Sequence, residues 1–199
     1  MTMFKKWFEG LFTPLKTFPA IKREANMKDA VLYIIIASAI YGIVGGILIA
    51  LLPATTMTMG YTMLAAMMGI SMLTLGVLFV VLMVIGALIG LFVQTAIFHL
   101  FAYLFGARAP GGFTKQLYFN SVFRSALLII MITAFIPILG IVLAVLLGLY
   151  SLFPLTVAIR EAYDFTWGKA VLTWVIPTII VVVLYVIMLM VMLAPLMMM

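Results

Sequence analysis

The sequence predicts an all-α integral membrane protein, a bundle of five transmembrane helices preceded by an interfacial amphipathic helix. Hydrophobic residues make up 68% of the 199 residues, and the mean hydropathy of +1.40 is far above that of a soluble domain. Beyond Ala30, the charged residues fall in two short loops, and Arg124 is the one charge well inside an apolar segment. Several uncharged runs reach the roughly 20 residues that a helix needs to cross a bilayer.

The N-terminal 29 residues form a polar segment that is distinct from the membrane domain at residues 30–199. Within this segment, apolar side chains recur at helical spacing, while Lys5, Lys6 and Glu9 lie on the opposite face. This pattern is typical of a helix that lies in the membrane interface. The membrane-interface anchors that it predicts are Phe4, Trp7, Phe8, Leu11 and Phe12.

The first transmembrane helix is expected at residues 30–52, with Asn26 as its N-cap. Gly42 and Gly46 in this helix have the spacing of small residues that allows close helix packing, and Gly86 and Gly90 repeat that spacing in the next apolar segment. That next segment, residues 61–105, is too long for one span and barely long enough for two spans with a turn.

Positive charges decide the number of spans. They gather in residues 1–29, 106–116 and 160–169, so these segments should all be cytoplasmic. Residues 61–105 must then cross the membrane once, with residues 63–75 at the outer interface or extending the span. The later spans are expected near residues 78–104, 117–136, 139–159 and 170–194, with the N-terminus in the cytoplasm and the C-terminus outside.

Catalytic chemistry is poorly represented. The chain has no cysteine and a single histidine, His99, which excludes thiolate sites and metal sites built from several histidines. Asp29 and Asp164 lie at helix boundaries, so they do not form a pair of aspartates at membrane depth. We therefore expect no enzyme, no cofactor and no metal site. The formal charge of +6 flanks apolar spans, which indicates membrane insertion and no nucleic acid partner.

Thr95, His99 and Tyr103 recur every four residues and form a polar stripe on the cytoplasmic half of the second span. Two interpretations stay open. The stripe could belong to a path for permeation or protons, or it could form hydrogen bonds between helices, which is the interpretation that we favour.

The third span carries Asn120 and Arg124, and the fourth ends near Glu161. A long arginine side chain can reach toward the headgroups, which reduces the cost of its charge in the membrane. We nevertheless expect Arg124 to face inward, where it would meet Asn120 and form an ion pair with Glu161, because each charge lacks another obvious opposite charge at its depth.

Short motifs lie in both halves of the chain. The N-terminal ones are Pro14, Thr17, Phe18 and Ile21, followed by Asp29-Ala30. The later ones are Gly112-Phe113-Thr114-Lys115-Gln116, Pro137-Ile138-Leu139-Gly140, Arg160-Glu161-Ala162-Tyr163, Trp167-Gly168-Lys169-Ala170 and Pro177. Together they resemble the prokaryotic branch of the Yip domain family over roughly residues 12–190.

The resemblance implies five spans with a cytoplasmic N-terminus, a role in membrane organisation and no defined reaction. The eukaryotic members are named for their interaction with Ypt/Rab GTPases. This chain lacks their long cytosolic N-terminal region and their acidic motif before the first span, so a small GTPase is not expected as a partner. The short N-terminal segment indicates a bacterial or archaeal protein of the cell membrane.

The function that we expect is that of a non-enzymatic Yip-like protein that organises or shapes the bilayer, or scaffolds other membrane proteins. Its expected partners are the lipid bilayer and either further copies of itself or other membrane proteins. The alternative is a small permease or channel, alone or as an oligomer, with a polar path near His99 and Arg124. A permease needs a hydrated path, whereas a scaffold can seal its polar residues.

Overall fold

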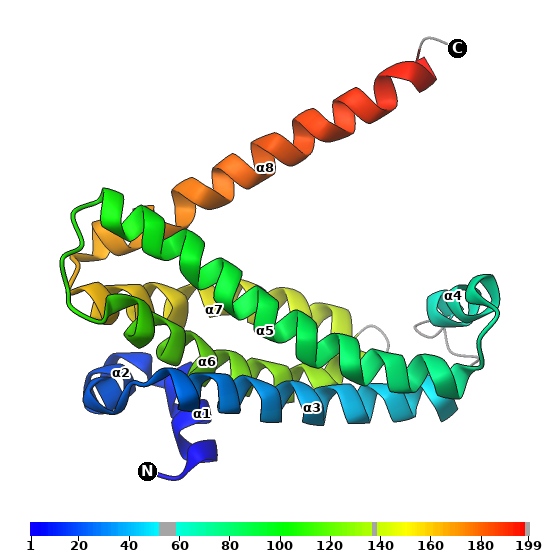
Figure 1. Cartoon of the computed structure of the whole chain (residues 1–199), viewed down its shortest axis with the longest axis horizontal. Helices are drawn as coiled ribbons and strands as arrows, with labels where there is room; N and C mark the ends of the chain where they lie inside the picture. The colour runs from blue at the N-terminus through cyan, green and yellow to red at the C-terminus, as the bar shows by residue number, and fades with distance from the viewer. Residues whose placement is uncertain (52–58, 137–138, 198–199) are drawn as a thin grey trace.

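The computed structural model describes residues 1–51, 59–136 and 139–197. Helices account for most of this part of the chain (Figure 1). They are α1 (Met3–Phe12), α2 (Pro14–Ile21), the 3-10 helix η1 (Lys22–Glu24), α3 (Met27–Leu51), α4 (Met59–Met68), α5 (Met72–Leu104), α6 (Gly112–Ile130), the 3-10 helix η2 (Met131–Phe135), α7 (Leu139–Tyr163) and α8 (Trp167–Met197).

Five of the described helices are long and apolar enough to cross a membrane: α3, α5, α6, α7 and α8. They alternate in direction, and the short α4 lies beside the start of α5 at the end of the bundle away from the N-terminus (Figure 1). The predicted number of five membrane-length apolar helices is confirmed, and residues 61–105 contain one of them, α5. Because Asn26 Oδ1 accepts a hydrogen bond from Asp29 N at 2.8 Å, the expected N-cap of the first span is also confirmed.

The helices α3 and α5 pack with their backbones close together. A Cβ atom built on Gly46 would lie 2.6 Å from the carbonyl oxygen of Gly76, and one built on Gly76 would lie 2.6 Å from the carbonyl oxygen of Gly46. Only glycine allows such an approach, so the predicted packing at Gly46 is confirmed. Gly86 and Gly90 differ, because a Cβ atom there would meet nothing within 4 Å. The same spacing therefore marks a helix contact on α3 and an open face on α5.

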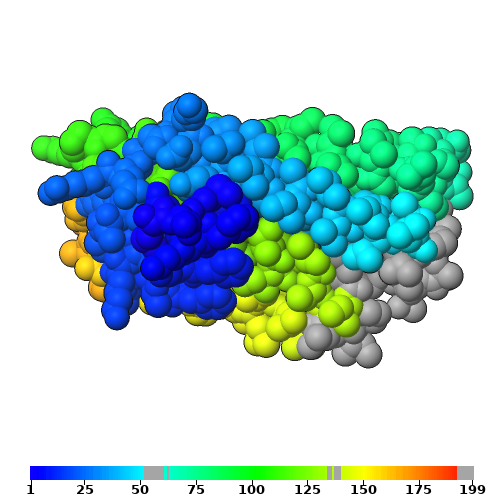
Figure 2. All heavy atoms as spheres, turned by 90° about the horizontal axis from the view of Figure 1, so that it is seen from below, coloured from blue at the N-terminus to red at the C-terminus, as the bar shows by residue number. Residues whose placement is uncertain are grey.

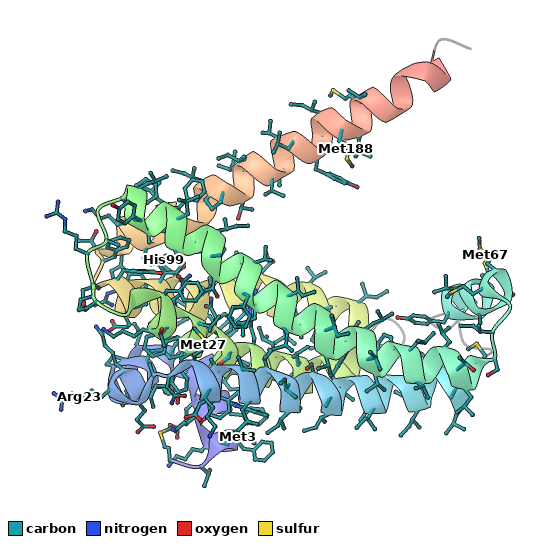
Figure 3. The ribbon with its side chains drawn as sticks, in the orientation of Figure 1. Met3, Arg23, Met27, Met67, His99 and Met188 are labelled. Carbon is teal, nitrogen blue, oxygen red and sulfur yellow. The ribbon has the colours of Figure 1, made fainter. Side chains whose placement is uncertain are left out.

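Most of the buried core lies toward one end of the bundle, around α6. This end, which we call the basic end, contains η1 and the turns at residues 105–111 and 164–166. From the same end, α8 diverges from the other spans, and Met188 on its outer half lies away from them (Figures 1 and 3). Residues 179–191 of α8 are exposed accordingly.

Candidate functional site

The N-terminal helical segment (α1, α2 and η1, residues 3–24) is packed into the bundle at the basic end (Figure 2). Gly10 makes this possible, because a Cβ atom there would collide with the side chain of Val122 on α6. Phe18 stacks on Phe119 of α6 with ring centroids 4.9 Å apart. The segment is therefore part of the folded domain and is not held by lipid alone.

The five side chains expected to anchor α1 in lipid separate into two groups. Trp7 and Leu11 are fully buried in protein, and the Trp7 ring packs against Tyr33 at a centroid distance of 5.9 Å. Both side chains fill the contact between α1 and the bundle, so the expectation that they lie in lipid is wrong. Three remain available to lipid, with exposed fractions of 51%, 37% and 55%: Phe4, Phe8 and Phe12.

Two ion pairs hold the same segment from its polar side. The Lys6 ammonium is buried; it pairs with Glu24 of η1 and lies 3.4 Å from the Tyr118 hydroxyl. Burial has the largest single effect and would lower the pKa of Lys6, but the hydrogen bond to Glu24 and the interactions with Tyr118 and Tyr33 together outweigh it, so this pKa lies above its usual value. The same bond holds the pKa of Glu24 below its usual value. The second pair joins Lys22 to Asp164, in the turn between α7 and α8, at 2.6 Å.

The predicted polar stripe on α5 is largely used for hydrogen bonds between helices. Thr95 accepts one from Asn120 of α6 at 3.1 Å. His99 lies near the basic end (Figure 3), with its Nδ1 atom 2.7 Å from the hydroxyl of Tyr163 on α7. Tyr103 is 70% exposed and does not join these bonds.

Tyr163 links side chains of two other helices. Its hydroxyl donates a hydrogen bond to Gln116 Oε1 at 2.6 Å and lies 2.7 Å from His99 Nδ1. Tyr163 also lies directly against Gly112, at the start of α6, where a side chain would collide with its ring. The phenol therefore joins α5, α6 and α7 at the basic end.

The expected ion pair between Arg124 and Glu161 is not formed. The carboxylate of Glu161 lies 3.8 Å from Arg160 on the same helix, and Asn120 is bonded to Thr95. Within the described residues, the Arg124 guanidinium has neither a hydrogen bond nor an ion pair. Arg124 lies instead in the wall of a cavity of about 310 Å³, to which His99 does not contribute.

Metal-binding groups are sparse in the part of the chain that the structure describes, where no three His, Cys, Asp or Glu side chains come together as a metal site.

The sequence did not predict the burial of Trp7, the ion pair between Lys6 and Glu24, or the position of Ser151 in the cavity wall. The helical spacing of Trp7 and Leu11 could have indicated a protein contact equally well.

A comparison with protein families gives one decisive match. The family model of the Yip1 domain matches residues 8–190, which is most of the chain. The chain belongs to the Yip1 domain family. The earlier resemblance is thereby confirmed at the level of the family, and with five apolar helices the Yip1-domain chain is a multi-pass membrane protein. Neither the curated proteins nor the solved structures gave a match.

Proposed function

We propose that this Yip1-domain protein is a non-enzymatic membrane protein that organises or shapes the bilayer, or scaffolds membrane partners, through its N-terminal helical segment. One observation carries the proposal. The helix α1 is fixed to the bundle by Trp7 and Leu11, while Phe4, Phe8 and Phe12 remain exposed beside that contact. Aromatic side chains inserted into one leaflet would spread its headgroups, and a rigid attachment transmits that local strain to the whole bundle.

The available energy is sufficient for insertion. With roughly 200 Å² for each phenylalanine and about 25 cal/mol per Å², the exposed parts of Phe4, Phe8 and Phe12 correspond to at most about 7 kcal/mol on full transfer to lipid. The exposed fractions used are 51%, 37% and 55%. Because α1 is already ordered by protein contacts, little of this energy would be lost to ordering the helix.

We further infer that the basic end faces the cytoplasm of a prokaryotic cell membrane. Positive charges next to the spans favour the cytoplasmic side during insertion. Cysteine labelling tests this directly, because the chain has no cysteine of its own. In intact cells, an impermeant maleimide should label Met67→Cys, on α4, and should label Arg108→Cys only after permeabilisation. Labelling of Arg108→Cys in intact cells would contradict the orientation.

The hydrogen bonds of the polar stripe support a sealed bundle over a permease. Thr95 and His99 are each bonded to a neighbouring helix, which is how a scaffold would satisfy buried polar groups. Vesicles containing the protein should therefore retain small trapped solutes as well as protein-free vesicles do. Specific solute flux that Thr95→Val or His99→Phe abolishes would favour the permease instead.

Vesicle remodelling tests the proposed role of the aromatic side chains. The purified protein is reconstituted into vesicles of phosphatidylethanolamine and phosphatidylglycerol, and vesicle shape is measured by cryo-electron microscopy. The parent protein should produce narrower vesicles or tubules, and the triple substitution Phe4→Ser, Phe8→Ser, Phe12→Ser should abolish this effect. The matched control is the triple substitution to leucine, which stays apolar and should retain it. Unchanged remodelling by the folded serine variant would exclude this function for α1.

A further inference from the structure

The cavity beside Arg124 lies deep in the bundle, between α3, α5, α6 and α7. Arg124 is twelve residues from the start of α6 at Gly112, and Gln94 is ten residues from the end of α5 at Leu104. At 1.5 Å per residue, the two side chains start about 18 Å and 15 Å from the basic end. With a hydrocarbon core of roughly 30 Å, both side chains start well inside it, and because helix side chains tilt toward the helix N-terminus, that of Arg124 leaves α6 in the direction of the basic end.

Two polar groups of this cavity, on Arg124 and Gln94, have no partner in the described part of the chain. No described residue bonds to the Arg124 guanidinium, and Gln94 Oε1 is buried without a hydrogen bond in the described structure. The hydroxyl of Ser151, on the α7 wall, donates its proton to Gly148 O at 2.6 Å. A charge at membrane depth is costly unless it is paired, so an anion is the partner that would lower the cost of burying Arg124 most.

The remaining walls describe the rest of the ligand. Ile34, Ala87 and Leu155 contribute apolar surface, and so do Leu127 and Leu128. The last two are half-buried, so the α6 wall of the cavity extends to the outer surface of the bundle, which faces lipid at this depth. The volume of about 310 Å³ is too small for a whole two-chain phospholipid but large enough for a charged group and part of an apolar chain.

We propose that this cavity binds the oxyanion of an anionic lipid, with Arg124 as the donor of paired hydrogen bonds. The planar guanidinium matches phosphate and carboxylate groups geometrically, and rotation of the Gln94 amide would bring its NH2 group to the same oxyanion. The apolar walls would cover the adjoining part of the lipid. A free inorganic anion has the same oxyanion chemistry but gains nothing from these walls, so a lipid is the favoured source. This binding site goes beyond the proposed role of α1 and does not depend on it.

Lipid binding to the full chain in detergent, followed by native mass spectrometry and by thermal unfolding, tests the proposal. Phosphatidylglycerol should bind and raise the unfolding temperature, whereas phosphatidylcholine and inorganic phosphate at the same concentration should not. Arg124→Gln should weaken phosphatidylglycerol binding by about ten- to a hundredfold, the range expected on loss of a charged hydrogen-bond donor. The matched control is Arg108→Gln, which removes the same charge from an exposed turn and should leave the affinity unchanged.

Two further results separate the site from general charge effects. Arg124→Lys keeps the charge but not the paired geometry, and should retain intermediate affinity. Ala87→Phe should reduce binding by filling the cavity while Arg124 is kept, so the proposal stays testable if Arg124→Gln fails to fold. Equal loss in the Arg124→Gln and Arg108→Gln variants, or equal binding of phosphatidylcholine, would overturn the site. A response to inorganic phosphate that matches the response to phosphatidylglycerol would overturn the lipid as its ligand.

Discussion

Trp7→Ala should release the N-terminal helical segment from the bundle, whereas Phe4→Ala should not. Trp7 is fully buried, with its ring against Tyr33 of α3, and Phe4 is 51% exposed. Truncation of a buried tryptophan costs roughly 3–5 kcal/mol, because it removes apolar contacts and leaves a cavity. If α1 were held only by lipid, both aromatic side chains would face the same environment, and the two substitutions would have similar effects.

Limited proteolysis measures the release of the N-terminal helical segment. When opening and closing are fast relative to cleavage, the cleavage rate follows the population of the open form. If the closed state loses roughly 3–5 kcal/mol of stability relative to the open state, the population of the open state rises by on the order of 10²–10³ or more. Cleavage within residues 1–24 should accelerate accordingly in Trp7→Ala. The acceleration in Phe4→Ala should be far smaller.

Trp7→Phe gives the sharpest control for this argument. The indole Nε1 atom of Trp7 is buried without a hydrogen-bond partner in the described structure, so loss of the N–H group removes no bond. The phenylalanine keeps most of the apolar contact, and its cleavage rate should stay close to that of the parent protein. Equal cleavage rates for Trp7→Ala and Phe4→Ala would refute the protein contact and return α1 to the lipid interface.

Three other predictions concern a helix contact, an ion pair of the N-terminal helical segment and a hydrogen-bonded tyrosine. Gly76→Val should destabilise the protein by about 1–3 kcal/mol or more in denaturant unfolding, because the new valine side chain would collide with a backbone carbonyl of α3. Gly86→Ala should be neutral or stabilising, because a Cβ atom there meets nothing within 4 Å. Glu24→Gln should speed cleavage of the N-terminal helical segment at neutral pH. Because Lys6 lowers the pKa of Glu24, the difference from the parent should vanish as pH falls below the usual carboxylate range, and its persistence there would contradict the pair. Tyr163→Phe removes a donor and an acceptor at the junction of three helices and should cost roughly 1–3 kcal/mol in the same unfolding assay; an unchanged midpoint would contradict that role.

The span count could be predicted from the sequence because it follows from two strong constraints. A helix must be long enough to cross the membrane, and positive loops must share one side. These constraints resolved residues 61–105 into a single crossing, although α5 begins at Met72, six residues before the expected start. The extra length is apolar, so composition alone could not place the boundary there. The Ser71 side chain caps the helix at Thr74 N, a local signal that does mark this start.

Helix partners were harder to predict, because lipid and protein present similarly apolar surroundings to a side chain. Trp7 and Phe4 lie on the same face of α1 by spacing, but Trp7 is fully buried against Tyr33 of α3, whereas Phe4 is about half exposed. Gly46 and Gly86 follow the same small-residue spacing, but only Gly46 meets another backbone. In a soluble protein, hydrophobicity separates inside from outside; in a membrane it does not, and three-dimensional shape must decide.

Arg124 and Glu161 do not form the expected ion pair because they lie at different distances from the ends of their helices. Glu161 is two residues from the end of α7, about 3 Å along the helix, whereas Arg124 is about 18 Å from the start of α6. The expectation treated the two residues as lying at one depth, and so it missed this difference. Arg160, adjacent in sequence, is close to the carboxylate at 3.8 Å and lies at its depth. Because the chain has only five acidic residues and the described ones lie near the basic end, a countercharge for Arg124 could come only from outside the chain, which is the physical reason to look for it in lipid.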